Sequence, residues 1–260
     1  MNPCPSHHRP FSTAFTLMEL LVVVAIILVL AAIAFPVIRG VQMRGHKVKA
    51  LHNMQQLAAA CMTYAGQNNN TLPAEDSKGQ DTWQNAAKPE NGKAWYNALP
   101  RLMGQKGVGD YAVTPRDYYT PANILYLSGA TYPDNESILR QPLFAIAINT
   151  KLQRKSPEGK KEDVMLSQIT NWPKTVLFLE QGLPKEKKAS AAQPKYDGSC
   201  KGSAKSFVAR YAGEGYVVFV DGHGQSISAK DILTESGSFP MPQTDIIWTR
   251  SPEEDPNKSN

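Results

Sequence analysis

One carboxylate in this chain is distinguished by its surroundings. Glu19 is the only charged residue in the apolar run FTLMELLVVVAIILVLAAIAFPVI, which covers residues 15–38. A run of this length can cross a bilayer as a helix, because about 20 apolar residues suffice at ~1.5 Å per residue. An ionised side chain at lipid depth is costly, so one that is kept there usually has a partner or a function. The sequence therefore predicts a membrane-inserted protein whose function depends on this acid.

Three other side chains have the types that an acid–base or metal site would need. Asp221 and His223 lie in the turn DGHG, and Glu180 ends an apolar run much as Asp221 does. The chain has no Gly-x-Ser-x-Gly elbow for a hydrolase, no Cys-x-x-Cys or His-x-x-x-His spacing and no dense Asp/Asn loop. We interpret Asp221 as a turn residue and His223 as solvent-facing. We predict no catalysis, no metal site and no cofactor, with Ca²⁺ left open as a ligand.

The elements that position these residues begin with a long helix. Beyond the apolar run, small and apolar residues recur at steps of three and four, at Leu51, Met54, Ala58, Cys61 and Ala65, and Val48 and Leu57 widen this stripe. Gly66 and the following QNNNTLP supply stop signals. The pattern predicts a helix from about Phe15 to about Ala65, membrane-spanning at about 17–38, with a bend or melted turn at Pro36 and Gly40.

The rest of the chain predicts one globular domain with a small sheet. A short helix is expected at 95–103, and strands at PLFAIAIN (142–149), TVLFLE (175–180) and YVVFVD (216–221). The Asp-Gly turn after the last strand, followed by QSIS, predicts a β-hairpin. A long helix packed on a small antiparallel sheet is an α+β fold.

Charge and cysteine content set further limits on function. The net charge is +5, but the basic runs QRKSPEGKKED and PKEKKAS lie among Pro, Gly and Ser and are interpreted as solvated loops. Aromatic residues do not alternate with these cations, so no nucleic-acid partner is predicted. Cys61 and Cys200 could form one disulfide or remain two thiols, since spacing does not show whether their Cα atoms come close enough.

The N-terminal segment resembles a known class of processing signals. STAFTLMELLVVVAIILVLAAIAFP is similar to the start of type IV prepilins and type II secretion pseudopilins. The resemblance implies that a prepilin peptidase removes residues 1–14, cutting between Ala14 and Phe15, and that the new N-terminus is methylated. Glu19 would be the fifth residue of the mature chain, and Pro36 falls where pilins often carry a helix-kinking proline. The family usually has Gly where this chain has Ala14.

The same resemblance gives the acid a partner. Cleavage would free an amine on Phe15, and a short axial offset between subunits would place Glu19 of one beside the amine of its neighbour. At low dielectric such a pair attracts strongly, whereas an unpaired carboxylate is penalised. The competing interpretation is a Glu that reaches water at the membrane edge or is protonated.

Membrane orientation can be read in two ways. Arg9 alone precedes the run, while Arg39, Arg44, Lys47 and Lys49 follow it, and this count would place the following domain in the cytoplasm. The resemblance implies the opposite. On that basis we expect a single-pass inner-membrane protein whose C-terminal domain is periplasmic.

A second resemblance lies near the C-terminus. ARYAGEGYVVFVDGHGQSIS is similar to a motif of large planctomycete and verrucomicrobial prepilin-like proteins, in which a His, nine residues and Asp-Gly follow one another. Asp221 and Gly222 are present here, while Tyr211 occupies the His position.

These observations predict a structural subunit that is not an enzyme. The expected parts are a leader (1–14), a long helix (15–66) and a pilin-like globular domain (67–260). Its partners would be prepilin peptidase, other pilin or pseudopilin subunits and an inner-membrane assembly platform, in a secretion pseudopilus or a type IV pilus. The alternative is a membrane-anchored extracytoplasmic module that binds polysaccharide or calcium and does not polymerise.

Overall fold

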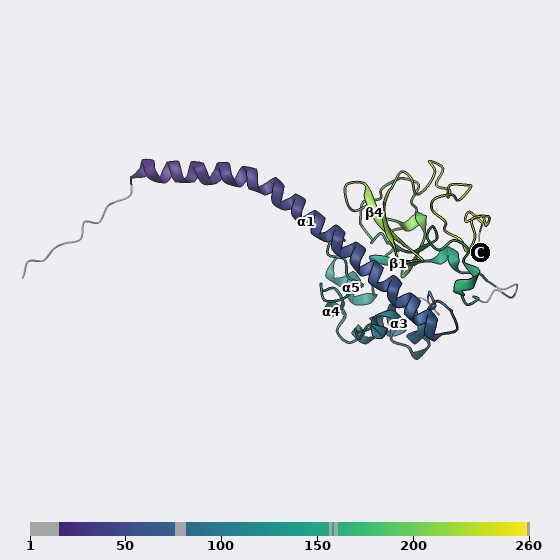
Figure 1. The fold of residues 1–260 in the computed structure, drawn as a ribbon. Coiled ribbons are helices and arrows are strands. Elements are labelled where there is room, and N and C mark those ends of the chain that lie inside the picture. The colour runs from purple at the N-terminus through teal and green to yellow at the C-terminus, as the bar shows by residue number, and fades with distance from the viewer. Residues whose placement is uncertain (1–15, 76–81, 156–157, 159–160, 259–260) are drawn as a thin grey trace, which may run out of the picture. The chain divides into compact units, whose positions relative to one another are not determined.

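The computed structural model describes residues 16–75, 82–155, 158 and 161–258, except for the side chains of residues 36–39 and 135 (Figure 1). The chain divides into two compact units, of which the first ends at Arg44 and the second begins at Gly45. The helix α1, Leu17–Gln67, begins in the first unit and ends in the second. Each unit is described by itself.

The first unit contains the apolar part of α1. Every side chain from position 17 to position 35 is exposed, including Leu21 at 62% and Ile33 at 64%. Since a helix that is apolar all round must be covered by lipid or by other protein, this segment has the character of a membrane span. Within the described residues, α1 is the one helix long and apolar enough to cross a membrane. The predicted N-terminal apolar helix is confirmed.

Helical backbone continues through the two positions expected to interrupt it. α1 is unbroken at Pro36 and Gly40, so the melted turn does not occur. The helix tolerates Pro36 although a proline removes one backbone hydrogen bond. A bend at Pro36 stays a prediction.

The second half of α1 packs into the globular unit as its periodicity predicted. Met54, Leu57, Ala58 and Cys61 are fully buried. Val48, expected in the same stripe, is 68% exposed, so the prediction is wrong at this position. Left-handed backbone follows the helix end, where Asn70 (φ 57°) donates its N–H to the Ala65 carbonyl at 2.8 Å. This arrangement satisfies a carbonyl of the last turn and explains why the helix ends at Gln67.

The sheet has five strands in the order β3-β1-β2-β4-β5. They are β1 (Ile146–Asn149), β2 (Val176–Glu180), β3 (Lys201–Gly202), β4 (Glu214–Phe219) and β5 (Gly224–Ser228). All neighbours are antiparallel except β1 and β3, which are parallel. The α+β class is confirmed, and the prediction of a purely antiparallel sheet is wrong.

The parallel pair has a topological cause. β2 ends where β1 begins, because the two strands are antiparallel, and the far side of β2 is taken by β4. The chain that leaves β2 therefore returns along the free edge of β1 in the same direction as β1. Phe144 N–H donates to the Gly198 carbonyl at 2.8 Å, and Ile148 N–H to the Cys200 carbonyl at 3.1 Å, as this course requires.

Both faces of the sheet are covered. Side chains of β4 alternate between them, so that Val218 packs with the α1 side, whereas Val217 and Phe219 pack with the segment that contains Trp248. The sequence predicted the cover by α1 but not the cover by the C-terminal segment. That segment joins the sheet through the Ile247 carbonyl, which accepts from Val176 N–H at 2.9 Å.

Short helical elements make up much of the rest of the globular unit. The predicted helix at 95–103 is confirmed as α3, Trp95–Leu102, with Trp95, Tyr96 and Leu99 fully buried. In Figure 1, α3, α4 and α5 lie on one side of the second half of α1 and the labelled strands on the other. The remaining elements are α2 (Trp83–Ala86), η1 (Pro89–Lys93), η2 (Val108–Tyr111), α4 (Pro115–Tyr118), α5 (Asn135–Arg140), η3 (Thr150–Leu152), η4 (Leu166–Gln168) and η5 (Ala204–Ser206).

Candidate functional site

Glu19 lies in the first turn of α1 and is held by Thr16. Glu19 Oε2 accepts from Thr16 N–H at 2.9 Å and from Thr16 Oγ1 at 2.7 Å. In return, Glu19 N–H donates to Thr16 Oγ1 at 3.2 Å. This reciprocal pattern is a capping box, which satisfies donors at the start of a helix. The spacing Thr-x-x-Glu could have predicted it, and our sequence reasoning missed this role of Thr16.

The capping box does not neutralise the acid. Thr16 offers neutral donors, and the carboxylate is exposed on an otherwise apolar stretch. An exposed anion on such a surface can pair with a cation supplied from outside this unit. Ala14 and Phe15, the residues expected at the cleavage point, lie outside the described residues.

Tyr211, which stands at the His position of the C-terminal motif, is buried. It starts a tight turn in which Tyr211 and Glu214 exchange two backbone hydrogen bonds, at 2.9 and 3.2 Å. Ala212 (φ 57°) and Gly213 (φ 91°) form the turn itself, in left-handed backbone. The tyrosine ring packs at 6.0 Å from that of Tyr216. Position 211 thus has a structural place between the turn and the core.

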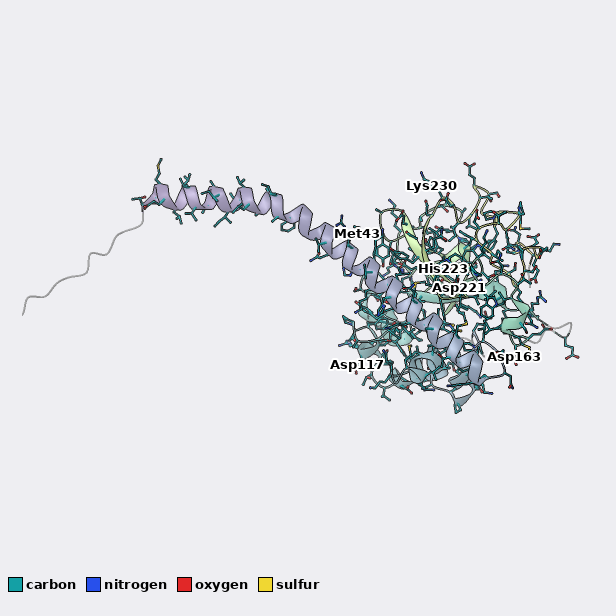
Figure 2. All side chains as sticks on the ribbon, in the orientation of Figure 1. Met43, Asp117, Asp163, Asp221, His223 and Lys230 are labelled. Carbon is teal, nitrogen blue, oxygen red and sulfur yellow. The ribbon has the colours of Figure 1, made fainter. Side chains whose placement is uncertain are left out.

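Asp221 and Gly222 form the turn of the β4–β5 hairpin, as predicted. Asp221 Oδ1 lies 2.7 Å from His223 Nδ1 and accepts from His223 N–H at 3.1 Å (Figure 2). The imidazole also stacks on Phe219 with ring centroids 4.4 Å apart. Gly222 has φ 91°, a conformation that glycine adopts without strain.

The same turn lies against α1. Gln55 Nε2 donates to the Gly222 carbonyl at 3.5 Å. A Cβ on Gly224 would approach Leu51 Cδ1 to 2.1 Å, so the missing side chain allows the hairpin to approach the helix closely. Gly222 and Gly224 therefore allow the hairpin to lie on the helix.

Glu180 does not join Asp221 and His223. β2 and β4 are antiparallel, so the ends of the two strands point to opposite ends of the sheet. Glu180 Oε2 accepts from Tyr216 N–H at 3.0 Å. Asp221 is five residues further along, or about 16 Å at ~3.3 Å per residue. The three side chains do not form one acid–base site.

Glu180 instead belongs to a buried ionic cluster with Arg210 and Glu186. Arg210 Nη2 lies 2.8 Å from Glu186 Oε2, and Nη1 lies 3.7 Å from Glu180 Oε1. The exposed fractions of the three side chains are 4% for Arg210, 7% for Glu186 and 0% for Glu180. One guanidinium thus faces two carboxylates where water has little access.

The electrostatics of the cluster follow from burial. Removal from water raises the pKa of Glu180 to about 7, although the charge of Arg210 acts in the opposite direction. Burial, and after it the Glu180 charge, also raises the pKa of Tyr211. Within the described part of the chain, Glu180 Oε1 and Tyr211 Oη are buried without a hydrogen-bond partner.

Sequence reasoning missed this cluster. Glu180 follows four apolar residues of a strand, a position where a charge needs a partner. Nothing local identifies that partner, since Arg210 is thirty residues away. The cluster has the geometry of a structural ion pair with one excess carboxylate.

Cys61 and Cys200 are both buried as thiols, with no disulfide between them. Cys200 Sγ lies 3.6 Å from the Glu75 carbonyl, to which it donates. Burial raises the pKa of Cys61, which keeps this thiol protonated. The structure therefore has the two-thiol state of the alternatives left open by the sequence.

A metal centre would need several ligating side chains close together. Across the described ranges, no group of three or more His, Cys, Asp and Glu side chains is arranged to hold an ion.

The chain was compared with models of protein families, with curated proteins and with solved structures. No family model, curated protein or solved structure matches it.

Proposed function

We propose that this chain is the structural subunit of a pilus-like or pseudopilus-like fibre, made as a prepilin and assembled through its N-terminal helix. One observation carries the proposal: α1 exposes an apolar surface from position 17 to position 35 that bears a single acid, Glu19, in its first turn. Apolar surface gains about 25 cal/mol per Å² when it leaves water, so this segment must be covered by lipid or by helices of other subunits.

The position of the acid favours assembly over simple anchoring. An anchor needs apolar length alone, and Glu19 lowers that apolarity. A fibre subunit gains from the acid, because an amine freed on Phe15 of a neighbour would neutralise it and favour one axial offset. Thr16 provides neutral hydrogen bonds to Glu19 before such a pair forms, at 2.7 and 2.9 Å.

In this proposal the chain is a substrate and a building block. Prepilin peptidase would cut between Ala14 and Phe15, and the mature protein would be held in the inner membrane with its globular unit on the periplasmic side. An assembly platform would then draw it into the fibre. The chain itself catalyses no reaction.

The rival is a membrane-anchored binding module that does not polymerise. The capping box favours this rival in one respect, because it gives Glu19 a local role that needs no second subunit. An experiment on the proposal must therefore separate the charge of Glu19 from its capping role.

Glu19→Gln makes this separation. Glutamine also serves in a capping box, so the variant retains the helix start and loses the charge. With the fibre-forming machinery present, we expect Glu19→Gln and Glu19→Ala to be inserted and processed like the unchanged protein and to be absent from the sheared fibre fraction. Thr16→Ala, which removes the cap and retains the charge, should still be incorporated.

A photo-crosslinking residue at position 23 gives an independent measurement. Polymerisation through α1 should yield ladders of crosslinked subunits, and Glu19→Gln should remove them. Incorporation of Glu19→Gln at the normal level would refute the pairing argument.

A further inference from the structure

The globular unit has a cleft of about 760 Å³ that the fibre proposal does not use. It is lined by four stretches that are remote in sequence: residues 129 and 131, 185–189, 208–210 with 212–214, and 228–230. A cleft of this volume can hold a ligand of a few hundred daltons or a segment of a polymer.

The carboxylate of Glu186 hydrogen-bonds to two of the other stretches that line the cleft. Glu186 Oε1 accepts from Thr131 N–H at 2.9 Å and from Arg210 Nε at 3.0 Å. Glu186 Oε2 accepts from Leu183 N–H at 2.8 Å and from Arg210 Nη2 at 2.8 Å. Because three of the four lining stretches meet at this group, the cleft is formed before any ligand arrives.

Backbone strain is concentrated in the same walls. The non-glycine residues with positive φ in the described part of the chain are Asn69, Asn70, Lys185 and Ala212. Asparagine adopts this conformation readily, whereas Lys185 (φ 72°) and Ala212 (φ 57°) do so at a cost. Both strained residues line the cleft. Strain of this kind persists only where the surrounding structure enforces it, and it is frequent at functional sites.

The mouth of the cleft has an excess of cations. Lysines 185, 187, 188 and 230 line it, against the carboxylates of Glu186 and Glu214. Arg210 is neutralised by its buried acids, and Lys185 pairs with Asp134 at 2.8 Å. Lys187 and Lys230 are exposed and form no ion pair with a residue that the structure describes. The basic run 184–190, interpreted from sequence as a solvated loop, thus forms one wall of a cleft.

We propose that this cleft binds a segment of an acidic polysaccharide, one that carries carboxylate, sulfate or phosphate groups. The uncompensated ammonium groups of Lys187 and Lys230 would meet the anionic groups. Thr131, Ser228 and the Glu214 carboxylate, which also line the cleft, can hydrogen-bond sugar hydroxyls.

Nucleic acid is the less favoured polyanion. Single-stranded nucleic acid is held largely by stacking of bases on aromatic side chains. Every residue that the structure describes in this lining is non-aromatic. The Glu214 carboxylate, whose side chain is half exposed, suits a hydroxyl group better than a phosphate.

Glycan binding at the cleft does not require assembly into a fibre. A polymerised subunit and an isolated membrane anchor would both present the cleft, so a failure of one proposal leaves the other standing. The fibre proposal is tested at Glu19, and the cleft is tested by charge reversal at its mouth.

The experiment measures binding to the full-length protein in nanodiscs of zwitterionic lipid at low ionic strength. The probes are polygalacturonate, dextran sulfate, neutral dextran and oligo(dT) of matched length. We expect the two acidic glycans to bind more tightly than the other two probes, with affinity that falls as salt rises.

Lys187→Glu/Lys230→Glu reverses the two uncompensated charges and should weaken binding of both acidic glycans by about tenfold or more. Lys88→Glu/Lys93→Glu makes the same change of net charge at two exposed lysines outside the cleft and should leave affinity within about twofold. Unchanged thermal unfolding of both variants shows that the fold is retained.

Several results would overturn the proposal: no binding of either acidic glycan, tighter binding of oligo(dT), or equal loss in the two double variants.

Discussion

Arg210 Nη2 lies 2.8 Å from Glu186 Oε2 in a place where both side chains are more than nine-tenths buried. Glu180 adds a second carboxylate 3.7 Å from the same guanidinium. Replacing Arg210 would therefore leave two acids buried without their cation. Arg210→Met, which retains volume and removes charge, is expected to lower the free energy of unfolding by about 3–5 kcal/mol.

Chemical denaturation of the full chain in detergent, monitored by tryptophan fluorescence, measures this loss. Arg101 provides the matched control, because it pairs with Asp110 at 2.6 Å on the surface, where both side chains are more than a third exposed. Arg101→Met should cost no more than about 1 kcal/mol. Similar losses in the two variants would contradict the role of Arg210 as the buried counter-ion of two carboxylates.

The Glu180 carboxyl gives the fold a dependence on pH. The pKa of this carboxyl is about 7 in the folded protein against an ordinary value of 4.5, because burial disfavours the charged form. The charge of Arg210 and the hydroxyl of Tyr211 lower this pKa, whereas the charge of Glu186 raises it. The folded state therefore holds this proton more tightly than the unfolded state. The contribution of this proton to the free energy of unfolding is therefore complete below pH 4.5 and is lost as pH rises towards 7.

At about 1.4 kcal/mol per pKa unit, this loss amounts to about 3 kcal/mol. Glu180→Gln cannot titrate, so its stability relative to the unchanged protein should rise between pH 4.5 and pH 7. Unfolding free energies measured at several pH values in this window provide the comparison. A difference that is constant with pH, or one that changes in the opposite direction, would show that Glu180 is not the buried proton carrier.

Gly222 is the position where the hairpin motif depends on backbone conformation. Its φ of 91° is unfavourable for any residue with a Cβ. Nothing lies within 4 Å of where that Cβ would be, so Gly222→Ala tests strain without a clash. We expect destabilisation by about 1–2 kcal/mol, measured as a lower midpoint of thermal unfolding. Gly92→Ala is the matched control, because Gly92 also has open space and its φ is not positive. An equal effect in both variants would rule out strain at Gly222.

The two buried cysteines should behave as protected thiols. In the folded protein, Cys61 and Cys200 are expected to resist alkylation, and both should react after unfolding without any reductant. Mass spectrometry of alkylated peptides measures the fraction modified under each condition. Alkylation of the unfolded protein that required prior reduction would instead indicate a disulfide.

The fold could be predicted where the pattern is local. The stripe from Leu51 to Ala65 specified the packed half of α1, and β-branched runs bounded by Pro and Gly specified β2 and β4. β3 could not be predicted, because it is two residues long, includes Gly202 and exists only through its pairing with β1. Its direction depends on the whole course of the chain between β2 and β3.

The candidate site divides in the same way. The Asp221 turn follows from two adjacent residues, and the structure places it where the Asp-Gly signal indicated. The cluster of Glu180, Glu186 and Arg210 depends on contacts across tens of residues, and strand direction separates Glu180 from Asp221. Such contacts leave no signal in the local sequence, so neither the cluster nor the cleft that Glu186 and Arg210 line could be predicted.

The N-terminus of the mature protein tests the central claim most directly. The fibre proposal requires a free amine four residues before Glu19, and only removal of residues 1–14 creates it. Mass spectrometry of the N-terminal peptide, from protein purified out of membranes, should find a chain that begins at Phe15 and carries one methyl group on its amine. A chain that still begins at Met1 would contradict the account.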